Sequence, residues 1–200
     1  MSDDNVAIVS GAARGMGKSF SERLSAEGYK VVAFDVDETV LKNKGVHGLV
    51  ADVSKVDQVD AVVQEANELG VIKVVVNNAG TWRRTPVETS WEQAISDWDY
   101  IMDTNLKGVL MLSRASIAHM KEAGGDIINV SSYYVLPAKS AGTNPPDTDL
   151  YNASKWALNG FTDAWAKYLD EYGIRVNGMG VDLTQTTQVD YISGYEDVEH

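Results

Sequence analysis

Short apolar runs alternate with longer amphipathic stretches along the whole chain. The runs are rich in valine, isoleucine and alanine and are bounded by polar residues or glycine: residues 5–11, 29–36, 48–53, 71–78, 126–132 and 174–180. A continuous apolar run of this length is typical of a strand that is buried on both faces of a parallel sheet. The pattern therefore predicts a strand at each of these places.

The stretches between the runs have helical periodicity. Residues 55–70 place apolar side chains on one helix face and end at a glycine, a frequent C-terminal residue of helices: Val56, Val59, Val62, Val63, Ala66 and Gly70. Residues 90–122 predict two helices, the second with an apolar face made by Leu110, Met111, Ile117 and Met120. Tryptophans at helix spacings favour core positions over cofactor contacts, namely Trp91, Trp98, Trp156 and Trp165.

Strands that alternate with helices through short connections imply a parallel sheet with helices on both faces. The sequence shows no repeat, no low-complexity segment and no linker. We therefore expect residues 1–200 to form a single α/β domain, a Rossmann-type three-layer α/β/α sandwich.

Composition and charge narrow the class of protein. The chain has 200 residues, 44% of them hydrophobic and 23% charged, which is typical of a soluble globular domain. A net charge of −12 disfavours binding to nucleic acid or to an anionic membrane. Without cysteine, disulfides and thiolate sites are excluded, and His47, His119 and His200 lack metal-ligand spacing, so no metal site is expected.

The ends and the hydropathy of the chain bear on its location. The N-terminal residues are acidic and lead directly into the first predicted strand, which is unlike a signal peptide. No apolar run approaches the length of a membrane span. We expect a cytoplasmic protein.

A glycine-rich turn follows the first predicted strand and opens a helix. In AIVSGAARGMGKSF the glycines are Gly11, Gly15 and Gly17, and Arg14 and Met16 stand between them. Glycines allow a tight turn and a close approach to a pyrophosphate, which the free N–H groups of a helix N-terminus attract. The position between strand and helix predicts a dinucleotide site more strongly than the glycines alone do.

The second predicted strand ends at an acid. Asp35 stands where Rossmann-type sites place a carboxylate for the adenosine ribose hydroxyls, and it would repel a 2′-phosphate, so NAD is favoured over NADP. Arg14 favours NADP weakly. Alternatively, Asp35, Asp37 and Glu38 form a solvated strand end.

Together with further motifs, the glycine turn makes the chain resemble the short-chain dehydrogenase/reductase family. The motifs occur in the order typical of that family and extend through nearly the whole chain. They are the glycine turn SGAARGMG, Asp52-Val53 after the third strand, NNAG at 77–80, Asn105 in TNLKG, NVSS, and YNASK. The resemblance implies that Asp52 and Val53 hold the adenine ring and that Asn78, Ala79 and Gly80 line the cofactor. It also implies a catalytic set of Asn105, Ser132, Tyr151 and Lys155.

The chemistry of these residue types supports that implication. Tyr151 and Lys155 are four residues apart, so a helix places them on one face. An ammonium or a nicotinamide cation beside a phenol favours the phenolate, so Tyr151 would exchange a proton with an alcohol or carbonyl oxygen. By resemblance, Tyr151 and Lys155 also contact the cofactor, Lys155 at the nicotinamide ribose. Ser132 rather than Ser131 orients the substrate, and Asn105 holds a helix open around a proton-relaying water. Taken singly, each of these features has a simpler explanation. Tyr151 and Lys155 would form a surface contact, the serines a turn at the end of a strand, and Asn105 a helix cap.

The sequence departs from the family pattern in three places. Residues 133–150 separate Ser132 from Tyr151, which is a longer separation than is usual in the family. Within it, Pro145 and Pro146 favour a loop over residues 137–149. This loop either rims the substrate pocket or lies in solvent. Val181 and Asp182 replace the usual Pro-Gly, while Thr186 still matches a threonine that contacts the nicotinamide amide. The chain ends at His200, so we expect six strands, with the family's seventh strand missing.

Aromatic and aliphatic residues lie at the family's substrate side. Trp82, Arg83 and Arg84 follow NNAG, and Tyr133, Tyr134, Val135 and Leu136 follow the serines. They suit a hydrophobic, cyclic or aryl secondary alcohol or ketone, although ordinary packing of aromatics explains them nearly as well. The leading hypothesis is therefore an NAD-dependent secondary alcohol dehydrogenase that works as a homodimer or homotetramer. The alternatives are an NADPH-dependent carbonyl or ketoacyl reductase and a truncated nucleotide-binding homologue without turnover.

Overall fold

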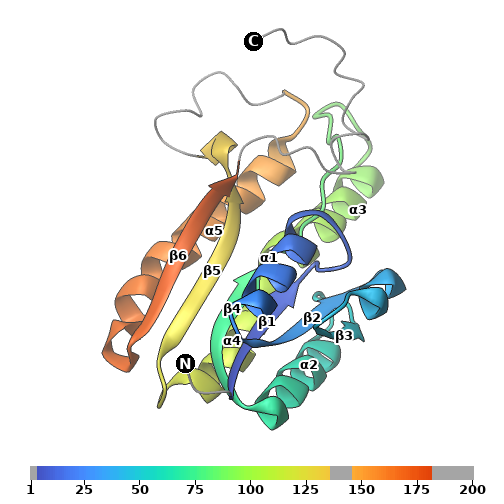
Figure 1. The fold of residues 1–200 in the computed structure, drawn as a ribbon. Helices are drawn as coiled ribbons and strands as arrows, with labels where there is room; N and C mark the ends of the chain where they lie inside the picture. Colours follow the sequence, from blue (N-terminus) through green and yellow to red (C-terminus); the bar gives the residue numbers. More distant parts are fainter. Residues whose placement is uncertain (1–3, 136–145, 182–200) are drawn as a thin grey trace, which may run out of the picture.

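A computed structural model of the protein describes residues 4–135 and 146–181. Its parallel sheet has six strands in the order β3-β2-β1-β4-β5-β6 (Figure 1). The strands are β1 (Asn5–Ser10), β2 (Lys30–Asp35), β3 (His47–Val50), β4 (Val71–Asn77), β5 (Gly125–Ser132) and β6 (Ile174–Val181). The prediction of a Rossmann-type parallel sheet is confirmed.

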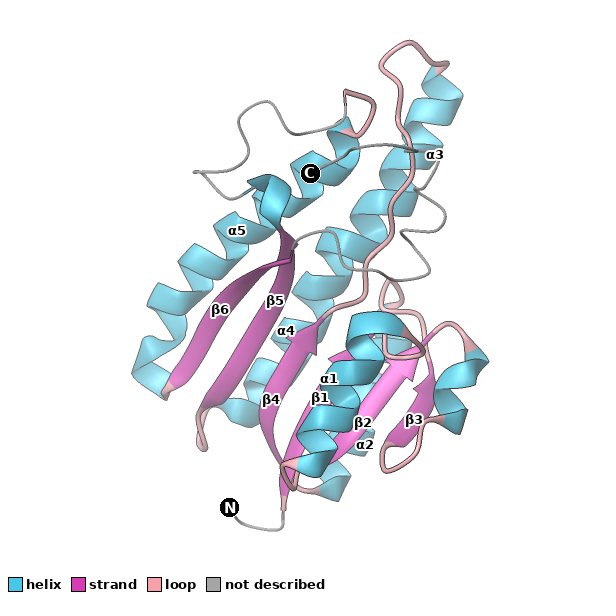
Figure 2. Ribbon diagram, turned by 45° about the horizontal axis from the view of Figure 1, so that its top comes forward, coloured by secondary structure: helices cyan, strands magenta, loops and turns pink. Residues whose placement is uncertain are grey.

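Helices cover both faces of this sheet. The α-helices are α1 (Gly15–Ala26), α2 (Val56–Leu69), α3 (Trp91–Met102), α4 (Gly108–Met120) and α5 (Asp149–Leu169). Short 3-10 turns span Glu38–Lys42, Tyr133–Val135 and Asp170–Tyr172. Figures 1 and 2 show α1 on one side of the sheet and α2, α4 and α5 on the other, so the strands are the middle of three layers.

Each face of the sheet has its own apolar core. Val59, Val62 and Val63 of α2 and Leu112 of α4 pack with Phe34 and neighbouring strand residues in the first core. On the other face, Met16, Phe20 and Leu24 of α1 pack against alternate residues of β1, β2 and β4. Strand residues that alternate between two covered faces explain why the strands read as continuous apolar runs.

The edges of several elements differ from the sequence prediction. β3 ends at Val50, so Ala51–Val53 leave the sheet and line the cleft described below. Gly70 follows α2 as predicted, but its φ of 155° is not that of a left-handed helix cap. A side chain there would meet the Asp4 carbonyl oxygen at 2.1 Å, so close packing requires this glycine. Val56 is 59% exposed and does not join the buried face of α2.

The expectation of two helices in 90–122 is confirmed, but a π-helical turn (Asp103–Lys107) joins them without a break. The prediction that the tryptophans belong to the core is wrong for three of them. Trp91, Trp98 and Trp156 are 86%, 51% and 46% exposed, whereas Trp165 packs against the core.

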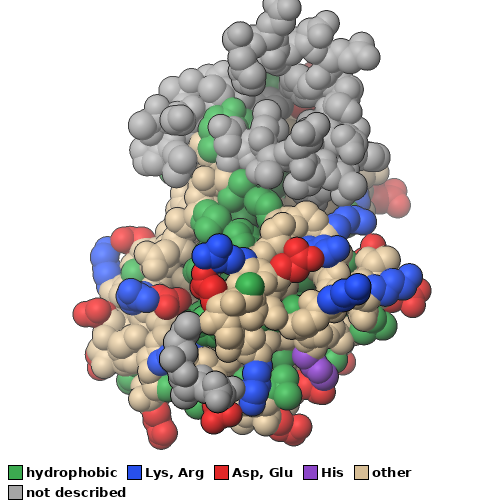
Figure 3. All heavy atoms as spheres, viewed as in Figure 1, with side chains coloured by type: hydrophobic (Ala, Val, Ile, Leu, Met, Phe, Trp, Pro, Cys, Tyr) green, Lys and Arg blue, Asp and Glu red, His purple; other side chains and the backbone are tan. Residues whose placement is uncertain are grey.

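The face of the molecule in Figure 3 carries acidic and basic side chains side by side. In the described part of the chain, no helix combines the length and the apolar composition needed to cross a membrane. Within 4–135 and 146–181 no group of three or more His, Asp or Glu side chains is arranged to hold a metal ion.

Candidate active site

The turn between β1 and α1 depends on its glycines. Gly11 and Gly15 have φ angles of 64° and 56°, in the region that favours glycine. A Cβ on Gly17 would lie 2.1 Å from the Gly11 carbonyl oxygen, and one on Gly11 would lie 2.7 Å from Ala79 Cα. These close approaches set the start of α1 directly above the ends of β1 and β4.

The first turn of α1 suits an anion. Its N-cap residue, Arg14, makes no capping hydrogen bond through its side chain, and no acidic residue lies in the first turn. The first N–H groups of a helix lack partners within the helix and lie at the positive end of the helix dipole. The glycine turn therefore offers the features that a pyrophosphate requires.

Asn78 and Ser10 fix this turn against β4. The Asn78 side-chain amide donates to the carbonyl oxygens of Ser10 and Gly11, at 3.0 Å each. Ser10 Oγ accepts from the backbone N–H groups of Asn78 and Ala79, also at 3.0 Å. Sequence reasoning missed this role of Ser10, whose only signal was its position just before the glycines.

Asp35 contacts the same turn from β2. Its Oδ2 accepts from the Ala13 N–H at 2.9 Å, and its Oδ1 accepts from the Asp37 N–H at 3.0 Å. Arg14 pairs with Asp37, with 3.4 Å between Nη1 and Oδ2. Hydrogen bonds from Thr39, and to a smaller extent the Arg14 charge, hold the pKa of the Asp37 carboxyl below its usual value.

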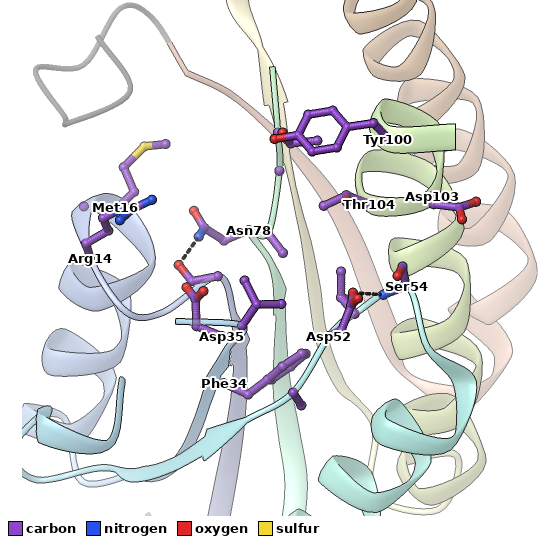
Figure 4. Close-up of a pocket in the computed structure, with 18 of the residues that line it drawn as sticks. Arg14, Met16, Phe34, Asp35, Asp52, Ser54, Asn78, Tyr100, Asp103 and Thr104 are labelled. Carbon is purple, nitrogen blue, oxygen red and sulfur yellow. Dashed lines mark hydrogen bonds between the residues drawn. The ribbon is translucent and has the colours of Figure 1, made fainter. Parts of the chain in front are cut away.

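A cleft of about 600 Å³ opens beside the turn (Figure 4). This volume lies within the range of small-molecule and cofactor sites, roughly 300–1,000 Å³. The cleft contains ten of the residues predicted to bind the cofactor: Gly11, Arg14, Gly15, Met16, Asp35, Asp52, Val53, Asn78, Ala79 and Gly80. Gly17 lies behind the turn and acts through packing.

The cleft also has walls that the sequence did not indicate. Asp99, Tyr100, Asp103 and Thr104 face it from α3 and the π-helical turn, together with Phe34, Val36, Ala51, Ser54 and Thr81. In Figure 4, Tyr100 and Thr104 lie across the cleft from Asp35 and Arg14. Carboxylates therefore outnumber the single arginine among the lining side chains. No local motif marks Asp99, Tyr100, Asp103 and Thr104, because only the packing of α3 and the π-helical turn brings them to the cleft.

Ser132 and Tyr151 meet at the carboxyl end of β5. Ser132 is the last residue of β5, and Tyr151 lies in the first turn of α5; the Ser132 side chain interacts with the Tyr151 phenol and acts to lower its pKa. Ser131 Oγ instead donates to Asn159 Oδ1 at 3.0 Å. This arrangement supports the choice of Ser132 over Ser131.

Lys155 lies one turn further along α5 and is 5% exposed. Its Nζ donates to the Val130 carbonyl oxygen at 2.9 Å and lies 5.7 Å from the centroid of the Tyr151 ring. Burial lowers the pKa of Lys155 to about 8. Burial also raises the pKa of Tyr151, and the hydrogen bond with Ser132 opposes this rise only in part.

The expectation that the Lys155 charge favours the Tyr151 phenolate stays a prediction. In the protein alone the Lys155 ammonium donates to the Val130 carbonyl oxygen, and desolvation is the main cause of the raised Tyr151 pKa. A lowered pKa would take a further positive charge beside the phenol.

Asn105 is fully buried in the π-helical turn. Its Oδ1 accepts from the Thr81 N–H at 2.7 Å, and its Nδ2 donates to the Thr81 carbonyl oxygen at 2.9 Å and to Ser154 Oγ at 3.2 Å. The predicted local widening of the helix is present, with this side chain at its centre. A Cβ on Gly80 would lie 3.6 Å from Asn105 Oδ1 and 3.7 Å from Lys155 Nζ, so the cleft leads directly to these two side chains.

The remaining predicted residues divide into described and undescribed ones. Thr186, Asp182 and most of the 137–149 loop, Pro145 included, lie outside the described residues. Val181 ends β6 opposite Ser132. The Tyr133 and Tyr134 rings lie 4.6 Å apart directly after β5, at the end of the sheet where Ser132 lies.

The residues present fit a nicotinamide dinucleotide. The glycine turn and the α1 N-terminus suit a pyrophosphate, Asp35 suits ribose hydroxyls, and the cleft ends beside Asn105 and Lys155, one helix turn from Tyr151. Such an arrangement can place a hydride carrier beside a hydroxyl group that exchanges protons.

Comparisons with known proteins agree with this geometry. Residues 5–194 match the family described as short chain dehydrogenase. A 3-alpha-(or 20-beta)-hydroxysteroid dehydrogenase of Mycobacterium tuberculosis is 37% identical over 198 residues, which cover 94% of this chain and 72% of that protein. A 3-oxoacyl-(acyl-carrier-protein) reductase of Thermotoga maritima is 33% identical over 195 residues, covering 92% and 76%.

Solved structures give the same picture. The crystal structure of a 3-ketoacyl-(acyl-carrier-protein) reductase from Brucella melitensis complexed with NADH superposes with a TM-score of 0.81. The two sequences are 29% identical, and the match covers 93% of this chain and 78% of that one.

Proposed function

The chain belongs to the short-chain dehydrogenase family, and from that premise we propose that it is an NAD(H)-dependent oxidoreductase interconverting a secondary alcohol and a ketone. The observation that carries the proposal is that Tyr151, which interacts with Ser132, lies one helix turn from buried Lys155, whose Nζ lies at the end of the cofactor cleft. We further propose a hydrophobic substrate, cyclic compounds included, because Tyr133 and Tyr134 follow Ser132 directly.

Tyr151 is the proton donor and acceptor in this proposal. In the oxidation direction its phenol oxygen receives the proton of the alcohol hydroxyl, and in reduction it returns a proton to the carbonyl oxygen. Ser132 donates a hydrogen bond to the same substrate oxygen. A bound nicotinamide dinucleotide supplies the hydride acceptor or donor.

Lys155 and Asn105 support the proton transfer. With a pKa of about 8, Lys155 gains and loses a proton close to neutral pH, as a relay group must. Asn105 fixes the π-helical turn to Thr81 and to Ser154 of α5. By resemblance, a water beside Asn105 relays protons to Lys155.

The charges in the cleft support NAD over NADP. Asp35 faces the expected ribose position, and Arg14, the residue that would attract a 2′-phosphate, is paired with Asp37. The Asp35 carboxylate would repel the 2′-phosphate of NADP, and the Arg14 charge that could offset this repulsion is already paired with Asp37.

A fluorescence titration with NADH and NADPH, followed by a screen of secondary alcohols, tests this function. The panel is cyclohexanol, 1-phenylethanol and a hydroxysteroid, with reduced-nicotinamide absorbance as the readout. We expect tighter binding of NADH and turnover of at least one alcohol. Tighter binding of NADPH would overturn the assignment of Asp35, and tight binding without turnover would favour a nucleotide-binding protein that does not catalyse.

A second candidate is an NADPH-dependent carbonyl or ketoacyl reductase. It is favoured by Arg14 in the glycine turn and by the similarity to 3-oxoacyl-(acyl-carrier-protein) reductases. Reduction of an acetoacetyl thioester with NADPH, faster than any alcohol is oxidised with NAD, would establish it.

The assembly and location are part of the same proposal. The family resemblance favours a homodimer or homotetramer in the cytoplasm. Trp91, Ile95 and Trp98 lie exposed on successive turns of α3, an apolar surface that a second copy would cover. Sedimentation analysis of the protein should show a dimer or tetramer; a monomer at micromolar concentration would contradict this part.

A further inference from the structure

Residues 81–85, which follow the NNAG motif, connect two parts of the candidate active site. At one end, the backbone of Thr81 exchanges two hydrogen bonds with the Asn105 side chain. In the middle, Arg83 donates to buried Asp97 of α3 at 3.0 Å and lies over the Tyr100 ring, 3.5 Å from its centroid. This part of the 81–85 segment is therefore fixed to α3 and the π-helical turn.

The other end of the segment contacts the residues that begin α5. The Thr85 N–H donates to the Asp147 carbonyl oxygen at 2.7 Å, and Thr85 forms a parallel β-bridge with Thr148. Thr85 Oγ1 donates to Asp149 Oδ1 at 2.5 Å. Arg84 also pairs with Asp147, 3.4 Å from Nε to Oδ2.

These contacts lie two to four residues before Tyr151. Asp149 is the first residue of α5, and its Oδ1 also accepts from the Leu150 N–H at 2.7 Å. The N-cap residue Thr148 makes no capping hydrogen bond to the helix N–H groups through its side chain. Thr85 and Arg84 therefore both connect the 81–85 segment to the start of α5, and only Thr85 contacts a residue of the helix itself.

We propose that Thr85 is a positioning residue for Tyr151, acting through Asp149. The Thr85–Asp149 hydrogen bond fixes the first turn of α5 at the place where the Tyr151 phenol reaches Ser132. The inference rests on the proposed function of Tyr151. Its physical basis is that proton transfer tolerates only small misplacements, since about 1 Å can cost as much as 100-fold in rate.

The chain offers substitutions that remove this hydrogen bond with little other change. Thr85→Val keeps the shape of the buried side chain and the backbone contact with Asp147, and exposed Asp149 retains its bond with the Leu150 N–H. Thr85→Ser restores the hydroxyl. Thr89→Val makes the same change at an exposed site in the same connection and serves as the control.

The experiment measures kcat, the KM values and the NADH dissociation constant of the full chain. The reaction measured is the oxidation by NAD of the alcohol that shows the highest turnover in the panel. Cyclohexanol oxidation is measured alongside it as a common reference for all variants. For Thr85→Val we expect kcat to fall about tenfold while the NADH dissociation constant changes less than about twofold. Thr85→Ser and Thr89→Val should keep kcat within about twofold of the original.

A double variant separates positioning from a general structural effect. In a Tyr151→Phe background, Thr85→Val should add no further loss of kcat, because the group that it positions is absent. An additive loss would overturn the proposal, as would an unchanged kcat in Thr85→Val or an equal loss of NADH affinity and kcat.

Should Thr85→Val fail to fold, exposed Asp149 carries the test. Asp149→Ala removes the acceptor and should lower kcat about tenfold, whereas Asp149→Asn keeps the acceptor and should stay within about twofold. Equal rates in these two variants would overturn the proposal. Full turnover by Tyr151→Phe would instead overturn the proposed function itself, whatever the Thr85 variants do.

Discussion

At the scale of the residue, Lys155 is a buried cation whose desolvation lowers the stability of the fold. The lysine is 5% exposed, and its ammonium faces a backbone carbonyl. Desolvation disfavours the charged form and moves the pKa from 10.5 down to about 8. The folded protein therefore tolerates a destabilising cation where the proposed proton relay needs one.

Replacement of this lysine by Met should stabilise the protein at pH 7. The folded-state pKa lies below the unfolded value, so the burial penalty is complete below about pH 8 and disappears as pH rises from 8 toward 10.5. Lys155→Met should raise the free energy of unfolding by up to about 3 kcal/mol at pH 7. Urea unfolding without cofactor at pH 7 and pH 9.5 checks this, and a gain that is the same at both pH values would contradict it.

The ion pair between Arg14 and Asp37 gives a second prediction. Asp37→Asn removes the pair and keeps the oxygen that accepts from the Thr39 N–H at 2.9 Å. With Arg14 released, NADPH should bind several-fold more tightly, and NADH affinity and stability should barely change, because an exposed pair contributes about 0–1 kcal/mol. Parallel fluorescence titrations of both cofactors measure it; unchanged NADPH affinity would show that Arg14 does not face the 2′ position.

At the scale of the element, the chain pattern predicts most strands and helices because each lies in a regular layer. The strands of 5–11 and 71–78 match β1 and β4 within a residue. The hydrophobic pattern does not predict where β3 ends, and only the family resemblance indicates the widening at Asn105 that joins α3 to α4. The π-helical turn is fixed by contacts of Asn105 with Thr81, which have no local period.

Two glycines in helices should respond oppositely to the same substitution. In α1, a Cβ on Gly17 would lie 2.1 Å from the Gly11 carbonyl oxygen, so Gly17→Ala should destabilise by about 1–3 kcal/mol and weaken NADH binding. In α5, a Cβ on Gly160 would meet nothing within 4 Å, so Gly160→Ala should stabilise by roughly 0.5–1 kcal/mol. Chemical denaturation measures the free energy of unfolding of both variants. A change of the same sign in the two variants would contradict the packing described for the glycine turn.

At the scale of the whole molecule, the parallel sheet explains why motifs far apart in the sequence form one site. Carboxyl ends of parallel strands lie at the same edge, so the glycine turn, NNAG and Ser132 come together there. Periodicity identified the helices of the tryptophans but not which face turns outward, so three of the four core predictions failed. Ser10, Tyr100 and Thr85 were missed because their roles arise from tertiary contacts.

Proton exchange by Tyr151 is the central claim, and Tyr151→Phe tests it most directly. The substitution removes one oxygen from a residue that does not line the cofactor cleft, so the NADH dissociation constant should stay within about twofold. Oxidation of the panel alcohol by NAD should fall by about 100-fold or more, the usual contribution of a general acid or base. Turnover by Tyr151→Phe at close to the original rate would contradict the mechanism proposed here.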